Sequence, residues 1–164
     1  MRTIPLAAGA ALLLVGPGVA SAQDEASPRL EGPYTAMYQK EAFGEPAVWR
    51  LDPRCRVGAC NVGVRSDGGL RGVLEYREST ETYRLVDKQD LDGTCEGENG
   101  TVERAYVQIR TIKLTGFAGE RVNGAVRFAR GTVLDLQRPT RRAQDAGCTE
   151  PLRKRSVIRL RARG

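Results

Sequence analysis

The residues best suited to chemistry are the cysteines, and the closest pair stands in the segment CRVGAC at residues 55–60. Such a pair can bind a metal, exchange electrons or form a crosslink. The other cysteines are Cys95 and Cys148, and the chain has no histidine, whereas zinc sites prefer two close cysteine pairs or cysteine with histidine. Thioredoxin-type enzymes place only two residues between their cysteines. We therefore expect structural disulfides, with no metal and no cofactor; a zinc site of all four cysteines is the remaining metal alternative.

The first residues of the chain indicate export, which decides the redox state of these cysteines. One basic residue, Arg2, precedes an apolar run over residues 4–15 and the small residues Ala20-Ser21-Ala22, the order typical of a secretory signal peptide. The run is shorter than the roughly 20 apolar residues of a membrane-spanning helix. We expect a protein secreted into the extracellular or cell-wall space and divided into a signal peptide (residues 1–22), a flexible leader (residues 23–32) and one domain (residues 33–164).

In an oxidising compartment an even number of cysteines usually forms disulfides, and four cysteines allow three pairings. The segments AVWRLDP before Cys55 and NVGVRS after Cys60 have the composition of strands. This pair would close a hairpin, where neighbouring strands approach the Cα separation of about 5.5 Å that a disulfide needs. We therefore expect Cys55–Cys60 and Cys95–Cys148. In the chain-entropy model the longer crosslink contributes about 4 kcal/mol and the shorter one roughly 2 kcal/mol.

Short extended segments separated by turns fill the rest of the chain, without a helical period. In SVIRLRAR, apolar residues at 158, 160 and 162 share one face and arginines occupy the other, as in a strand with one buried and one solvated face. Asn123-Gly124 suits a tight turn, and Gly131 a bend within a strand. We predict strands over residues 33–40, 46–52, 60–66, 70–78, 80–87, 102–116, 122–137 and 154–163.

Eight successive strands with short connections predict an all-β fold, an antiparallel meander that closes into a small barrel, because closure removes exposed strand edges. A two-sheet β-sandwich is the alternative. Within residues 102–116 the apolar positions up to Ile109 have one parity and those from Ile112 onward have the other. This change predicts a bulge or crossing near Arg110 and Thr111. The cysteines Cys95 and Cys148 fall in two predicted long loops, residues 87–100 and 138–151.

The chain is basic, with 26 Lys and Arg against 20 Asp and Glu and a formal net charge of +6 at pH 7. The excess lies in the last part of the chain. A local basic surface can contact an anionic envelope polymer, nucleic acid or lipid head groups, or it can be the solvated face of a strand. The absence of aromatic residues from residue 129 onward argues against nucleic acid. The candidate surface residues are Arg141, Arg142, Arg153, Lys154, Arg155, Arg159, Arg161 and Arg163.

No constellation of residues predicts catalysis. Without histidine the usual base of a serine nucleophile is missing, and neither GxSxG nor SxxK occurs. Glu75, Glu78 and Glu81 lie close in sequence, at a turn where they fit a solvated surface. The segment DLDG resembles part of a calcium loop, but Lys88 and Asn99 occupy its two essential ends, so a polar turn is the better interpretation. The aromatic residues fit core packing, with the lining of a ligand pocket as the alternative.

Several short features occur in a fixed order: Trp49 before CRVGAC, Cys95 after DGT, Gly131-Thr132 and Gly147-Cys148. In this order the chain resembles small exported four-cysteine β-domains of high-GC bacteria. Those domains stand alone after a signal peptide or form outer regions of membrane-anchored signalling proteins, and their function is unassigned. Gly32-Pro33-Tyr34 lies where lipocalins carry GxW, so the chain also resembles the lipocalin shape. The resemblance implies a β-barrel and no substrate.

These observations lead to three functional hypotheses for a monomeric protein. The first is a non-catalytic binding protein for an envelope component or a small apolar ligand. The second is an inhibitor or protein-interaction module whose disulfide-tethered loops dock on a partner. The third is a hydrolase with an unrecognised carboxylate site. An open apolar cavity favours the first, a filled interior the second, and a cleft with facing carboxylates the third.

Overall fold

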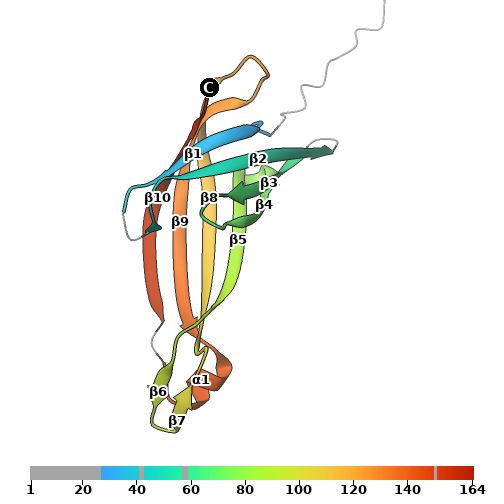
Figure 1. The fold of residues 1–164 in the computed structure, drawn as a ribbon. Helices are drawn as coiled ribbons and strands as arrows, with labels where there is room; N and C mark the ends of the chain where they lie inside the picture. Colours follow the sequence, from blue (N-terminus) through green and yellow to red (C-terminus); the bar gives the residue numbers. More distant parts are fainter. Residues whose placement is uncertain (1–26, 41–42, 57–58, 150) are drawn as a thin grey trace, which may run out of the picture.

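The fold is an all-β barrel with a small lobe at one end (Figure 1). The computed structural model describes residues 27–40, 43–56, 59–149 and 151–164, so the predicted signal peptide lies outside the described residues. Eight antiparallel strands close the barrel in the order β1-β10-β9-β8-β5-β4-β3-β2. The predicted barrel is confirmed. The sandwich alternative is wrong, because β10 pairs with β1 and closes the sheet on itself.

Every strand predicted from the sequence is present, with limits that shift by a few residues. The barrel strands are β1 (Gly32–Tyr38), β2 (Ala47–Arg56), β3 (Ala59–Ser66), β4 (Arg71–Arg77), β5 (Thr82–Leu91), β8 (Tyr106–Glu120), β9 (Val126–Pro139) and β10 (Leu152–Ala162). A short 3-10 turn, η2 (Glu78–Thr80), connects β4 to β5.

The two segments predicted as long loops are more ordered than expected. The first begins as the end of β5 and then forms a hairpin of β6 (Cys95–Gly97) and β7 (Gly100–Val102). The second contains the helix α1 (Arg141–Asp145), whose first turn is capped by the Thr140 side chain. Together β6, β7 and α1 make the lobe at the lower end of Figure 1.

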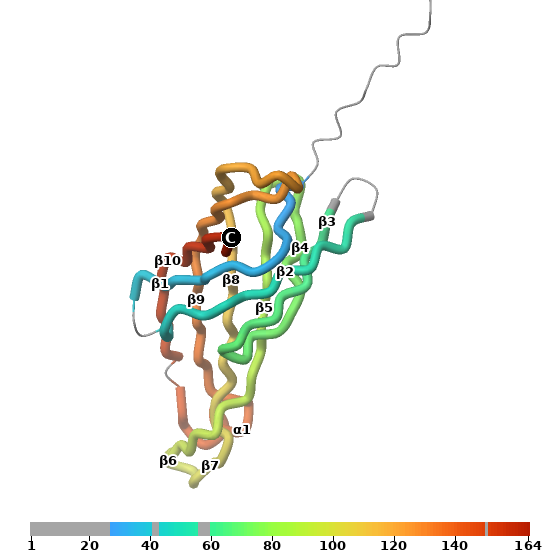
Figure 2. The backbone as a smooth tube through the Cα atoms, turned by 45° about the horizontal axis from the view of Figure 1, so that its top comes forward, coloured from blue at the N-terminus to red at the C-terminus, as the bar shows by residue number. Residues whose placement is uncertain are grey.

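The strands have unequal lengths, which divides the barrel into two levels (Figure 2). β4 pairs with β5 only through residues 75–77 and 82–84, and β1 pairs with β10 only through residues 34–38 and 158–162. Beyond these pairs β5, β8, β9 and β10 continue side by side towards the lobe. The closed level is the region in which all eight strands pair to complete the ring. The extension is the remainder, residues 85–91, 106–112, 133–139 and 152–157.

Side chains fill the inside of the closed level. Trp49, Tyr34 and Tyr83 are its largest buried side chains, each 0% exposed, and Phe117 packs edge-on against Tyr83 with ring centroids 5.9 Å apart. Burial raises the pKa of Tyr34 and of Tyr83, and both hydroxyls donate to backbone carbonyls. A barrel of eight strands is just wide enough for such filling. The closed level therefore has a packed core.

The change of phase in β8 has a different cause from the predicted bulge. The register of β8 with β9 is continuous from Tyr106 to Leu114, and the irregularity falls between Leu114 and Gly116. The prediction of a bulge or crossing near Arg110 and Thr111 was therefore wrong. The apolar positions change face there because β8 passes from the extension, whose inner face is polar, into the closed level, whose inner face is apolar.

Gly131 lies on β9, opposite the irregularity in β8. It pairs with Leu114, and a Cβ atom at Gly131 would lie 1.9 Å from the carbonyl oxygen of Lys113. No side chain fits that space, so β8 and β9 approach closely only because this residue is glycine. The position predicted as a bend is thus a point of close backbone approach beside the bulge.

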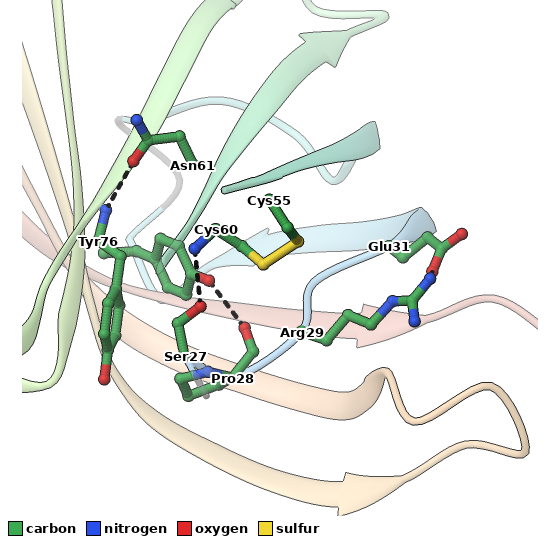
Figure 3. The surroundings of a disulfide bond; sticks show 9 residues. Ser27, Pro28, Arg29, Glu31, Cys55, Cys60, Asn61 and Tyr76 are labelled. Carbon is green, nitrogen blue, oxygen red and sulfur yellow. Dashed lines mark hydrogen bonds and ion pairs between the residues drawn. A yellow bond between two sulfur atoms is a disulfide. The ribbon is translucent and has the colours of Figure 1, made fainter. Parts of the chain in front are cut away.

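Part of the segment predicted as a flexible leader packs on the barrel. Residues 23–26 lie outside the described residues, but Leu30 is 0% exposed and belongs to the core. Ser27 Oγ accepts the N–H of Cys60 at 3.0 Å, and the Tyr83 hydroxyl donates to the carbonyl oxygen of Pro28 at 2.9 Å (Figure 3). Residues 27–31 therefore contribute to the domain core.

Both predicted disulfides are present. Cys55–Cys60 joins directly opposed residues of β2 and β3, beside Ser27 and Pro28 (Figure 3). Residues 57–58 of the enclosed turn lie outside the described residues. Cys95–Cys148 joins β6 to the segment after α1 and so crosslinks the lobe. Two disulfides fit an oxidising compartment.

Candidate functional site

A row of charged side chains crosses the inner face of the extension. Strand pairing places Asp87, Arg110, Asp135 and Lys154 opposite one another on β5, β8, β9 and β10. Arg110 Nε and Nη2 donate to the two carboxylate oxygens of Asp135 at 2.8 and 2.9 Å, and Gln108 Nε2 donates to the same carboxylate at 3.0 Å. Acid and base alternate along the row, so it balances its own charge.

This row supports a structural ion pair better than a pair of catalytic carboxylates. The Asp135 side chain is 10% exposed, and both of its oxygens already accept hydrogen bonds. The hydrogen bond to Asp135 raises the pKa of Arg110, so the arginine stays charged. Arg110 occupies the strand position between Asp87 and Asp135, whereas general acid-base chemistry needs a carboxyl group free to exchange a proton.

The segment resembling a calcium loop is divided between β5 and the lobe. Asp92 pairs with Arg104 at 3.5 Å, and Asn99 Nδ2 donates to the carbonyl oxygen of Asp145 at 3.2 Å. Within the described residues no group of three or more His, Cys, Asp or Glu side chains is placed to hold a metal ion. The Asn99 contact joins the β6–β7 hairpin to α1, whereas the Asp92–Arg104 pair is solvent-exposed and contributes little stability.

The structure separates the predicted basic surface into three places. Arg141 and Arg142 lie on α1, and Lys154 belongs to the charged row. The other predicted residues alternate with the buried inward-facing side chains of β10 and are exposed on the outside of the barrel. We call this set the arginine column: Arg153, Arg155, Arg159 and Arg161 on β10, and Arg163 directly after it.

The arginine column has no acidic partner among the described residues. The ion pairs found there are elsewhere: Arg29–Glu31, Arg54–Asp52, Arg104–Asp92 and Arg110–Asp135. Alternate residues of a strand lie roughly 6.8 Å apart, so the column brings several cations close together, with half-buried Val157 as the interruption. Like charges at this spacing create a positive potential that attracts anions.

Beside the upper part of the column, the outer wall of the barrel is hollowed over β1, β8, β9 and β10. This hollow, the Phe128 hollow, has a volume of about 540 Å³. Phe128 is 43% exposed and Met37 39% exposed, and the guanidinium carbon of Arg161 lies 5.9 Å from the centroid of the Phe128 ring. Two rows of paired residues across the strands line it: Arg161, Phe128 and Ala118, then Met37, Arg159, Arg130 and Gly116.

The small residues of β8 create the depth of the Phe128 hollow. A Cβ atom at Gly116 would lie 2.9 Å from Cγ of Arg130, so the apolar stem of Arg130 lies across the glycine. Ala118 stands directly beside Phe128. The floor is therefore largely apolar, while guanidinium groups stand at its rim.

A second hollow, the arginine hollow, adjoins the first near the turn between β8 and β9. Its volume is about 760 Å³. Arg121 there also donates from Nη1 to the carbonyl oxygen of Glu31 at 3.4 Å. Among the described residues, no acidic side chain lines either hollow. The lining includes Phe128, Gly164 and the arginines Arg121, Arg127, Arg161 and Arg163.

Phe128, Met37 and Arg130 were not among the predicted site residues. The aromatic residues were expected in the core, with the lining of a ligand pocket as the alternative. Core packing is wrong for Phe128, which is 43% exposed, shares its parity with exposed Arg130 and alternates with buried Ala129. That alternation is readable in the sequence. The position of Met37 is not, because it depends on β1 pairing with β10 when the barrel closes.

No family model, curated protein or solved structure matches this chain. Within the described residues, no helix has the length and apolar character needed to cross a bilayer. The candidate sites consequently rest on the geometry of the chain itself.

Proposed function

We propose that the protein is an exported, non-catalytic binding protein that recognises an anionic component of the cell envelope through the arginine column. The observation that carries this proposal is a line of exposed arginines on one wall of a rigid barrel, none of them paired with an acid among the described residues. Guanidinium groups bind phosphate and carboxylate oxygens in a planar, two-point geometry. An anionic ligand would therefore supply the missing partners.

The filled closed level favours a ligand on the outside of the barrel over a small apolar ligand inside it. Trp49, Tyr34 and Tyr83 occupy the space in which a barrel of this size would hold an internal ligand. The outer wall, in contrast, combines charge with two open hollows. The envelope component is accordingly the better of the two ligands expected from the sequence.

The proposal is tested by titrating the disulfide-bonded protein with sodium polyphosphate, a soluble linear polyanion, at several salt concentrations. We expect binding that weakens steeply as salt rises, because exposed charges are screened. The variant Arg159→Gln/Arg161→Gln should bind about tenfold more weakly, which corresponds to roughly 1.4 kcal/mol.

The matched control is Arg71→Gln/Arg77→Gln, which removes the same charge from exposed positions on β4. It should leave the affinity nearly unchanged. Equal weakening by both variants would mean that net charge alone drives the binding, and binding independent of salt would contradict an electrostatic site.

A protein-interaction module is the second candidate, and the rigidity of the lobe favours it. The Cα atom of Gly97 packs so closely on the lobe backbone that a Cβ there would lie 1.8 Å from the Ala146 carbonyl oxygen. The N–H of Asn99 donates to the same oxygen at 3.2 Å, and Cys95–Cys148 crosslinks the two segments. Binding of a partner that is lost on substitution of Arg141 and Arg142, with the arginine column intact, would favour this candidate.

A further inference from the structure

The Phe128 hollow exposes apolar side chains to water on the outer wall of the barrel. An exposed aromatic side chain beside an exposed methionine presents apolar surface to water, at a place where strands usually carry polar side chains. Arg130 and Arg159 flank this surface with their apolar stems. The volume of about 540 Å³ is in the range of roughly 300–1,000 Å³ found for small-molecule sites. An apolar group of a ligand would fit the floor of this hollow.

The arginine hollow continues from the Phe128 hollow and has the opposite chemistry. Phe128 and Arg161 line both hollows, so a ligand can occupy the two without leaving the surface. Arg121, Arg127 and Arg163 supply additional guanidinium groups in the second hollow, and they take part in none of the ion pairs among the described residues. The pair of hollows thus presents a cationic part next to an apolar part.

From this juxtaposition we infer that the ligand is a single anionic lipid. Its phosphate group binds in the arginine hollow, and an acyl chain lies over Phe128 and Met37. This inference rests on the proposed function, since it names the class of anionic component that the wall binds. A purely polar polymer would pair with the arginines but leave the apolar floor uncovered. A purely apolar ligand would leave the arginines without a partner.

A single-stranded nucleic acid is the competing ligand, because bases stack on aromatic rings beside basic residues. The surroundings of Phe128 favour a lipid. The neighbours of the ring within the hollow are Met37, Ala118 and Gly116, together with arginine stems, and such stacking platforms use successive aromatic rings. The nucleic acid is therefore an outcome of the test.

The experiment compares soluble probes that differ in one part at a time: dihexanoyl phosphatidylglycerol below its micelle concentration, dihexanoyl phosphatidylcholine and glycerol 3-phosphate. We expect the anionic lipid to bind at least about tenfold more tightly than either of the others, a difference of roughly 1.4 kcal/mol. Lengthening its acyl chains by two carbons should tighten binding further, because more apolar surface is buried.

The variant Phe128→Ala should remove the advantage of the lipid over glycerol 3-phosphate, and it should weaken polyphosphate binding far less than Arg159→Gln/Arg161→Gln does. Phe128→Leu should retain most of the advantage, which separates an apolar contact from a requirement for an aromatic ring. The control Leu152→Ala truncates another exposed apolar residue of β10, 51% exposed at the end of the strand far from the Phe128 hollow, and should change nothing.

The outcomes separate this inference from the proposed function. If polyphosphate binds but the lipid binds no better than glycerol 3-phosphate, the inference is overturned and the proposed function stands. If neither binds, both fall. If an oligothymidylate binds in a Phe128-dependent manner that Phe128→Leu abolishes, while the lipid does not bind, the ligand is a nucleic acid and the inference is equally overturned.

Discussion

The closed level and the extension of the barrel place apolar side chains on opposite faces of the same strands. At the edge of the closed level, where the extension begins, Ile112 and Val133 face the filled interior and are 0% exposed. One step along the same faces, in the extension, the inward positions hold Arg110 and Asp135, and half-buried Leu136 stands on the outside. The alternation continues without a break, so only the environment on each side of the sheet changes.

The comparison teaches that the buried face of a strand depends on what lies opposite it. In the closed level β1–β4 complete the ring, and an apolar interior is shielded from water. In the extension these strands are missing, and the inner face carries the polar row, in which Asp135 is paired with Arg110. On the outer face Arg153 and Arg155 pair with Leu136 and Leu134, where the arginine stems cover apolar surface.

The largest difference between the two levels is expected from truncating an apolar side chain in each. Trp49→Ala should lower the free energy of unfolding by about 3–5 kcal/mol, because it empties space in a packed core. Val86→Ala, on the outer face of the extension where the residue is 52% exposed, should change it by less than about 0.5 kcal/mol. Urea unfolding measures both.

The indole nitrogen of Trp49 is buried and has no hydrogen-bond partner among the described residues. Trp49→Phe should therefore cost clearly less than Trp49→Ala, since no hydrogen bond is lost. A loss as large as that of Trp49→Ala would contradict this account of the core.

The disulfides sharpen the comparison, because each belongs to a different end of the barrel. Replacing Cys95 and Cys148 by serine should cost about 4 kcal/mol, and replacing Cys55 and Cys60 roughly 2 kcal/mol, since the cost grows with the length of the closed loop. Hydrogen exchange should show that the first pair of substitutions loosens the lobe and the second only the hairpin of β2 and β3. Loosening of the whole barrel by the short-loop variant would contradict the division into levels.

Variants of the charged row measure how much the Arg110–Asp135 ion pair contributes to the stability of the extension. In the closed level the corresponding contribution comes from packing. Asp135→Ala leaves Arg110 without its carboxylate and should cost about 2 kcal/mol, less than for a fully buried pair because the Arg110 side chain is 24% exposed. Arg110→Leu/Asp135→Leu should cost less than Asp135→Ala, since an unpaired charge no longer remains. Thermal unfolding of the two variants decides the order, and a costlier double variant would mean that the pair itself stabilises the fold.

The smallest effect concerns pH and belongs to the closed level. Burial raises the pKa of Tyr34 and of Tyr83 above the ordinary value of about 10. The unfolded chain therefore releases these protons at a lower pH than the folded protein. The free energy of unfolding should be insensitive to this ionisation below pH 9 or so and should fall as the pH rises above about 10, until the folded pKa is passed.

Urea unfolding at increasing pH measures this slope. Tyr83→Phe should reduce the slope and cost about 1 kcal/mol at neutral pH, through loss of its hydrogen bond to Pro28. An unchanged slope in this variant would show that Tyr83 does not contribute to the alkaline loss of stability.

Much of the fold was predictable because strands leave local signals. Alternation in SVIRLRAR assigned buried Ile158 and Leu160 and exposed Arg159 and Arg161 to their correct faces. The pairing of Cys55 with Cys60 followed from the two flanking strands. The β6–β7 hairpin and α1 were missed, since Gly, Asp and Thr in these segments read as loop residues and the packing around Cys95–Cys148 orders them.

The candidate site was only partly predictable, for a related reason. The arginines of β10 are visible in the sequence as a basic run, but Lys154 turns inward to the charged row, and Arg141 and Arg142 lie in the lobe. Nothing local to the C-terminal segment indicates which other strands stand beside it.

By itself the sequence determined the all-β class, the pairing of Cys55 with Cys60 and the alternation that exposes the arginine column, because each depends on neighbours along the chain or on a single hairpin. The pair Cys95–Cys148 then follows because only these two cysteines remain. Only the tertiary structure decided that the strands form a closed ring and that its core lies at one level. Closure also places Met37 of β1 and Phe128 of β9 on either side of β10. These arrangements depend on contacts between residues far apart in the chain, whose strand partners and register arise when the whole barrel closes.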